Sequence, residues 1–263
     1  MANKKTKPVC KPYLKGKPLS KQVLKRGTRL LAFQIVFILF YLLLGASLSI
    51  GGAVLRVITS LVLIAVCGAL VWMEGVKAGD EDVCAGQIAY GKQETGRTVT
   101  NEEKEKAFHP AKGFVTVLIA VLIPVLICLV YALMCKKDTY HLQNLPSWIS
   151  SSAGEGDYLA LRYYTETESI GLVGVLSLVV RTCIYPFLNM VSSTDFNARY
   201  VIDRLSPLLV IIPFLPYAFG YLTGPRQRAG IQDSINRNNA KAKRQRRKQE
   251  QRKAEREQKN RLI

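Results

Sequence analysis

The stretch LLAFQIVFILFYLLLGASLSI, residues 30–50, decides the fold of this chain. It carries no charged residue, and its length matches the roughly 20 apolar residues that a helix needs to cross a hydrocarbon core. A buried helix of a soluble protein rarely runs so far without a polar face. The sequence therefore predicts that this stretch crosses a membrane as a helix.

Four further apolar stretches follow along the chain, at residues 54–73, 114–134, 170–190 and 206–222. The first of these is joined to the opening stretch by the short turn Gly51-Gly52-Ala53, which predicts a transmembrane hairpin. The third contains Arg181, whose charge costs roughly 2.5 to 3.5 kcal/mol at the centre of an inserted helix. The last is interrupted by three prolines. The last two stretches are therefore the weaker spans.

The distribution of charge predicts the orientation of the chain. The first 29 residues hold ten Lys or Arg and no acid, and residues 226–263 hold fourteen Lys or Arg against four acids. Basic residues that flank transmembrane helices stay on the cytoplasmic side. Both ends are therefore expected in the cytoplasm, which requires an even number of crossings.

The predicted fold is an all-α, polytopic transmembrane helix bundle with four full crossings and one partly inserted or broken apolar helix. We favour 170–190 as the segment that does not span. Two alternatives remain: 206–222 is the segment that does not span, or all five stretches span and the carboxy-terminal tail is external. The expected location is the cell membrane, as a multi-pass protein.

This interpretation divides the chain into seven segments: a basic disordered amino-terminal tail (1–29), a transmembrane hairpin (30–73), a cytoplasmic loop with a short helix (74–113), a transmembrane helix (114–134), an external loop (135–169), two apolar helices of which one is not a simple span (170–222), and a disordered polybasic tail (223–263). In the cytoplasmic loop, Thr100 and Glu103 form a capping-box pattern that predicts a helix running to about Phe108. The acidic run 80–82 is expected in a solvated turn, with a divalent-cation site as the alternative.

Motifs for chemistry are missing from this sequence. It has no Walker loop, no HExxH helix and no Gly-x-Ser-x-Gly elbow, and its six cysteines are scattered without a CxxC pair. The sequence therefore predicts no enzyme, no catalytic residue, no cofactor and no metal site. An intramembrane enzyme that uses Glu74 and His109 is the weakest of three hypotheses.

Arg181 is the polar candidate at membrane depth. An arginine at this depth usually faces a bundle interior and finds a carboxylate or carbonyl partner. The acids within reach along the sequence are Glu166, Glu168, Asp195 and Asp203. Alternatively, the helix lies at the membrane interface and Arg181 contacts lipid phosphates.

The surrounding string VVRTCIYPF, residues 179–187, resembles the arginine-containing helix of the membrane-protein insertase family. The resemblance implies an arginine in a groove and a basic tail that binds the ribosome. It covers nine residues, and the order of the helices differs, because in that family the arginine helix comes first.

The carboxy-terminal tail offers a second candidate site. Residues 241–261 have no apolar stripe, so they are expected as a solvated rod that neither forms a coiled coil nor inserts into a membrane. Its expected anion contacts are Lys241, Lys243, Arg244, Arg246, Arg247 and Lys248. Membrane lipids with anionic headgroups are the nearest partners, and an acidic cytoplasmic protein or the ribosome is the alternative. A sequence-specific reader of nucleic acid is not expected, because residues 226–263 contain no aromatic ring to stack on bases.

The resulting functional hypothesis is an integral membrane accessory or scaffold protein that anchors polybasic cytoplasmic tails. The alternative is a transporter, channel or insertase-like conduit that uses Arg181 at membrane depth.

Overall fold

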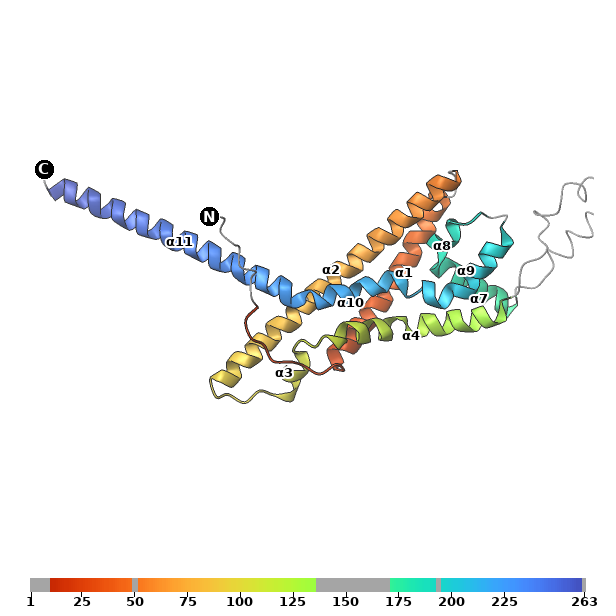
Figure 1. Cartoon of the computed structure of the whole chain (residues 1–263), viewed down its shortest axis with the longest axis horizontal. Helices are drawn as coiled ribbons and strands as arrows, with labels where there is room; N and C mark the ends of the chain where they lie inside the picture. The colour runs from red at the N-terminus through yellow and green to blue at the C-terminus, as the bar shows by residue number, and fades with distance from the viewer. Residues whose placement is uncertain (1–9, 49–51, 136–170, 193–194, 262–263) are drawn as a thin grey trace, which may run out of the picture. The chain divides into compact units, whose positions relative to one another are not determined.

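The computed structural model describes residues 10–48, 52–135, 171–192 and 195–261, and all regular structure within these ranges is helical. Contacts divide the chain into two compact units. Unit 1 comprises residues 1–18, 76–110 and 220–263, and unit 2 comprises residues 19–75 and 111–219. Figure 1 labels the helices of both units.

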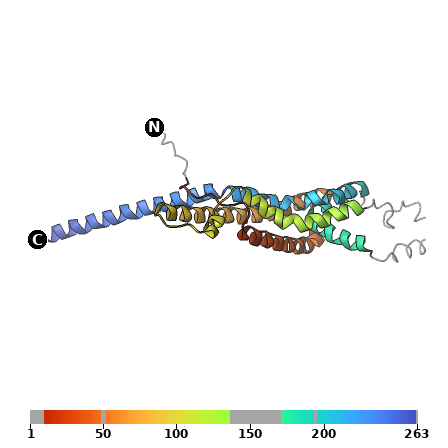
Figure 2. The same cartoon turned by 90° about the horizontal axis from the view of Figure 1, so that it is seen from below.

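Unit 2 holds most of the apolar helices. They are α1 (Lys21–Leu48), the first part of α2 (Ala53–Glu94), α4 (Ala111–Met134), α7 (Leu172–Cys183), α8 (Tyr185–Asn189), α9 (Phe196–Leu209), η2 (Ile212–Phe214) and the start of α10 (Leu215–Leu222). Helix α4 packs against α1, α7 and α9. It lies alongside α9 in both views (Figures 1 and 2).

Three helical segments are long and apolar enough to cross a membrane: Ala53–Glu94, Ala111–Met134 and Asn197–Leu222. Their large apolar side chains are widely exposed, including Leu61, Leu118 and Leu133. An apolar surface this extensive is unusual for a soluble monomer. These features indicate a membrane protein.

The two weaker predicted spans differ in the structure. Residues 172–183 form a helix of only 12 residues, α7, which is too short to cross a bilayer. The region 197–222 is long enough, although the prolines divide it into α9, η2 and α10. Helix α1 contains residues 30–48 of the first predicted span. The total of four crossings stays a prediction, and the predicted external loop 135–169 lies outside the described residues except for Cys135.

Unit 1 departs from the predicted cytoplasmic loop. Helix α2 does not stop at the end of its apolar stretch but continues to Glu94, because residues 74–94 contain no proline and Ala, Lys, Glu and Gln support a helix. Gly96, with φ of 72°, then ends the helix, while the amide of Arg97 donates to the carbonyl of Lys92. The acidic run 80–82 therefore lies inside a helix, and the expected solvated turn is wrong.

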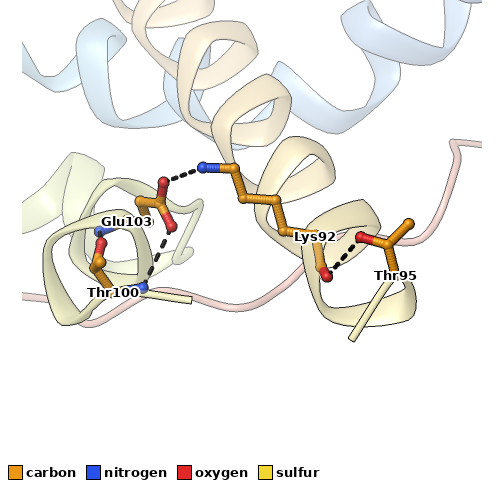
Figure 3. Close-up of polar contacts among 4 residues, drawn as sticks. All are labelled: Lys92, Thr95, Thr100 and Glu103. Carbon is orange, nitrogen blue, oxygen red and sulfur yellow. Dashed lines mark hydrogen bonds and ion pairs between the residues drawn. The ribbon is translucent and has the colours of Figure 1, made fainter. Parts of the chain in front are cut away.

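The short helix predicted after Thr100 is confirmed as α3 (Asn101–Lys106), which ends two residues earlier than expected. The Thr100 hydroxyl accepts from the amide of Glu103, and the Glu103 carboxylate accepts from the amide of Thr100. Lys92 forms an ion pair with the same carboxylate and ties α3 to α2 (Figure 3). The hydrogen bond from Lys92, with help from the Thr100 backbone, holds the pKa of Glu103 below its usual value.

The amino-terminal tail is also more ordered than predicted. Residues 21–29 belong to α1, and residues 10–18 pack on unit 1. The amides of Leu14 and Gly16 donate to the carbonyls of Gly86 and Phe108, at 3.1 and 2.9 Å. The prediction of disorder relied on charge and proline content and missed these backbone pairings. Residues 1–9 lie outside the described residues.

Aromatic rings continue this packing within unit 1. The ring of Tyr13 meets Phe108 edge-on at 5.8 Å, and Phe108 stacks on Tyr221 at 5.1 Å. The Tyr221 hydroxyl donates to the Asp82 carboxylate at 2.6 Å, and Asp82 is only 2% exposed. The carboxylate that was expected in solvent is therefore part of the core of unit 1.

The carboxy-terminal tail is a helix rather than a disordered segment. Helix α11 (Gly224–Arg261) is drawn as one continuous helix in Figures 1 and 2. Its Arg, Lys, Gln, Glu and Ala residues are strong helix formers, and Arg237 pairs with Asp233 one turn earlier at 2.7 Å. The prediction of a rod with a solvated surface fits this helix, whereas the prediction of disorder does not.

Glycines allow a close helix crossing in unit 1. A Cβ atom at Gly79 would clash with the backbone carbonyl oxygen of Tyr221 and lie 3.1 Å from the Cα of Gly224. The obstacle is backbone, which cannot move aside as a flexible side chain can. By contrast, a Cβ atom at Gly91, on the same helix, would meet nothing within 4 Å.

This difference predicts opposite effects of the same substitution. Gly79→Ala should lower the free energy of unfolding by about 1 to 3 kcal/mol through overpacking. Gly91→Ala should raise it by about 0.5 to 1 kcal/mol, because alanine favours the helix. Thermal unfolding of the two purified variants in one detergent measures both effects. Equal stabilisation by both substitutions would contradict the close crossing.

Candidate functional site

Arg181 and Asp203 form an ion pair inside unit 2. The distance from Arg181 Nη2 to Asp203 Oδ2 is 2.7 Å, and Arg181 Nε lies 3.3 and 3.2 Å from the two carboxylate oxygens. The Asp203 side chain is 1% exposed, whereas that of Arg181 is 36% exposed. The carboxylate of the pair is therefore buried, whereas the guanidinium is partly exposed at a surface.

The other acids considered as partners lie elsewhere. Asp195 caps α9, and its carboxylate accepts from the amide of Ala198 at 3.0 Å. Glu166 and Glu168 fall outside the described residues. Among the four acids, Asp203 is the one that the structure places against Arg181.

An apolar cluster holds the ion pair in position. Val180 and Ile184, on either side of Arg181, are fully buried against Cys128 and Tyr131 of α4 and Val210 beyond α9. Helix α7 ends at Cys183 with Ile184 as its C-cap, and α8 begins at Tyr185 with Pro186 in its first turn. Because α7 is short, Arg181 lies in its last turn, where a cation interacts favourably with the helix dipole.

A groove of about 650 Å³ opens beside the pair. Three arginines contribute to its lining, namely Arg56, Arg181 and Arg199, together with polar residues that include Ser177, Tyr185 and Asn189. No Asp or Glu is among the described residues that line it. The groove therefore has a basic wall within an otherwise apolar unit.

Two polar pairs support the wall of this groove. Asn189 donates to the hydroxyl of Ser60 at 3.1 Å, and Ser60 is 1% exposed. The Tyr131 hydroxyl donates to Ser177 at 3.2 Å. A buried polar group without a hydrogen-bond partner destabilises the fold. Each of these bonds satisfies such a group and holds the lining in a defined geometry.

Sequence reasoning found Arg181 but missed most of this groove. It gave no role to Ser60, Asn189 or Arg199. Ser60 and Asn189 each interrupt an apolar stretch, which was the available signal. Nothing in the sequence showed that the two meet, because they are 129 residues apart.

The second candidate site is the basic surface of α11. Its six predicted anion contacts are exposed: Lys241, Lys243, Arg244, Arg246, Arg247 and Lys248. The base of the helix is fastened within unit 1, where Arg228 donates to Cys84 Sγ at 3.0 Å and lies 3.8 Å from Asp80. Gln232 donates to Gln87 at 2.8 Å. The helix is therefore fastened at its first turns and exposed at residues 234–253.

Glu74 and His109, the residues of the enzyme hypothesis, belong to different units. Glu74 forms an ion pair with Arg29 at 2.9 Å in unit 2. His109 belongs to unit 1. Within the described ranges, no group of three His, Cys, Asp or Glu side chains is placed to hold a metal ion.

The buried pair predicts a specific pattern of stability. Arg181→Met should lower the free energy of unfolding by about 3 to 5 kcal/mol, because it leaves the Asp203 carboxylate buried without this cation. Adding Asp203→Leu should restore most of the loss, since an apolar pair tolerates burial. Chemical unfolding of the single and double variants in detergent measures both changes. If Arg181→Met alone is as stable as the unmodified chain, the pair has no structural role.

No known family model, curated protein or solved structure matches this chain. Function is therefore inferred from the chemistry of the groove and of α11.

Proposed function

We propose that this chain is an integral membrane scaffold protein whose helix α11 binds anionic surfaces in the cytoplasm. The observation that carries the proposal is the surface of α11. Residues 234–253 are all exposed and contain nine Lys or Arg against one Glu. A surface of this kind attracts phosphates and carboxylates.

The geometry of α11 favours contact along its length over insertion. Its 38 residues correspond to about 57 Å of helix at 1.5 Å per residue. Ile235, Ala240 and Ala242 are the only apolar residues of the exposed stretch, so it has no face that could enter lipid. Binding must therefore be electrostatic, worth about 1 kcal/mol for each basic residue close to an anionic membrane surface.

The orientation of the chain supports the same role. Residues 1–29 and 226–263 each carry ten net positive charges, and the positive-inside rule puts such segments in the cytoplasm. The cytoplasmic leaflet is the one that carries the anionic lipids. An acidic protein or the ribosome offers the same chemistry as a partner.

A helix with a reduced positive charge tests this function. The chain is embedded in nanodiscs of neutral phosphatidylcholine and mixed with vesicles that contain phosphatidylglycerol. The unmodified chain should bind these vesicles at low salt and release them as salt rises, because screening weakens exposed charges. Replacement of the six predicted contacts by glutamine, which keeps helix propensity, should greatly weaken the association, because it lowers the net charge of residues 226–263 from +10 to +4.

The matched control exchanges Lys for Arg and Arg for Lys at the same six positions, which preserves the charge, so vesicle binding should persist. Vesicle binding that survives the six glutamines would refute the proposal. Co-purification of the same variants from native membranes then shows whether the natural anion is lipid or an acidic partner.

A conduit is a second candidate function, and the arginine-lined groove favours it. Polar side chains inside a membrane bundle commonly mark the path of a substrate or ion. In proteoliposomes, Arg56→Gln should reduce the flux of a small anion such as phosphate several-fold relative to Arg204→Gln, which replaces an exposed arginine outside the groove lining. Equal phosphate flux through both variants, or no flux through the unmodified chain, would contradict the conduit hypothesis.

A further inference from the structure

An apolar cavity of about 150 Å³ lies among α1, α4 and α7 in unit 2. Aliphatic side chains dominate its lining, and among the described residues that line it Gln34 supplies the only amide side chain. Cys128 and Val180, at its base, are buried, whereas Ile35 and Ile123 are more than half exposed. The cavity therefore opens toward the apolar outer surface of the unit.

Gln34 carries an unsatisfied acceptor in this cavity. The residue is 7% exposed, and its Oε1 atom has no hydrogen-bond partner among the described residues. A buried polar atom without a partner costs free energy. The thiols of Cys128 and Cys183 also line the cavity, but a thiol is a weak donor and neither bonds this oxygen. The oxygen is therefore available to a donor that enters the cavity.

The cavity lies at the middle of an apolar helix. Helix α4 is long and apolar enough to cross a membrane, and its midpoint falls at Ile123, which lines the cavity. Cys128 lies about 8 Å farther along the helix, at 1.5 Å per residue. A hydrocarbon core about 30 Å thick extends about 15 Å to either side of its centre. A ligand that reaches this cavity must therefore be soluble in lipid.

Water is poorly suited to this cavity. A buried water needs several polar partners, and here it would find only the Gln34 amide and two weak thiols among the described side chains. Apolar cavities of this size stay dry. A ligand that combines an apolar surface with one hydroxyl group satisfies the Gln34 oxygen and keeps the aliphatic side chains in contact with carbon atoms.

The size of the cavity selects the kind of hydroxyl compound. An apolar cavity of this volume holds one benzene ring. A hydroxyl group on such a ring supplies the missing donor, and a phenolic hydroxyl is more acidic than an aliphatic one, which makes it the stronger donor to an amide oxygen. A phenol therefore matches both the volume and the acceptor.

We propose that this cavity binds the phenolic ring of a lipid-soluble molecule, whose hydroxyl donates a hydrogen bond to Gln34 Oε1. The rest of the molecule extends past the exposed side chains of Ile35 and Ile123 into the surrounding lipid. All residues of the site belong to unit 2 and none to α11, so binding of phenols and binding of anionic surfaces can fail separately.

Fluorine NMR of the full chain in phosphatidylcholine nanodiscs tests the site. The probes are 4-fluorophenol and 4-fluorotoluene, which have nearly the same shape but differ in the hydroxyl donor. Empty nanodiscs correct for the partition of each probe into lipid, and 4-fluorophenol should then bind more tightly than 4-fluorotoluene. Gln34→Met keeps the length of the side chain but removes the acceptor. It should weaken 4-fluorophenol binding about tenfold and change 4-fluorotoluene binding less than about twofold.

Gln22→Met is the matched control. Gln22 lies on the same helix, and its Oε1 atom is also buried without a hydrogen-bond partner in the described part of the chain, but it does not line the cavity. Each substitution removes an unsatisfied oxygen, so each should raise the midpoint temperature of thermal unfolding. Only Gln34→Met should change the binding of 4-fluorophenol.

A second variant fills the cavity. Ile127→Phe adds a ring to the lining and should abolish 4-fluorophenol binding, with thermal unfolding as the check that the variant is folded. Four results would overturn the proposal: equal binding of the two probes, unchanged 4-fluorophenol binding by Gln34→Met, an equal loss with Gln22→Met, or full binding by Ile127→Phe.

Discussion

A carboxylate without solvent contact inside an apolar helix bundle costs free energy unless it is paired or hydrogen-bonded, and Asp203 meets this condition through Arg181. This ion pair holds α7 and α9 together, because Arg181 belongs to α7 and Asp203 to α9. Val180 and Ile184, which flank the arginine, fill the space beside α4. The same pairing keeps the Arg181 side chain at the edge of the groove, so the packing of unit 2 and the lining of the groove depend on one contact.

Unit 1 solves a related problem by different means. Its buried carboxylate, Asp82, is satisfied by the hydroxyl of Tyr221, whose ring stacks on Phe108. Close contact between Gly79 and Gly224 brings the backbones near enough for this hydrogen bond. The unit thus uses small residues to create proximity and aromatic rings to fill the remaining volume.

The sequence predicted those features that depend on local pattern. Apolar length identified the helices α2 and α4, and the Thr100–Glu103 pattern identified α3 with its cap. The sequence did not predict the features that depend on contacts between residues far apart in the chain. It did not show, for example, that Gly79 meets the backbone of Tyr221 and Gly224.

Charge was the most misleading signal, because basic tails were expected to be disordered. Residues 10–18 are held by hydrogen bonds to Gly86 and Phe108, which composition cannot reveal. For the groove, the sequence predicted Arg181 as a polar residue at membrane depth and included Asp203 among four possible partners without choosing between them. It could not show that Arg56 and Arg199 line the same groove as Arg181, because only the folded chain brings these arginines together.

The charge pattern of α11 has one more consequence. Lys243 and Arg247, Arg244 and Lys248, and Lys248 and Arg252 are like-charge pairs one turn apart, and each such pair weakens a helix by a few tenths of a kcal/mol. An anionic surface that neutralises these charges removes the repulsion. Binding and helix formation therefore reinforce each other: the rod becomes stiffer when it is occupied, and its helical content reports whether it has found a partner.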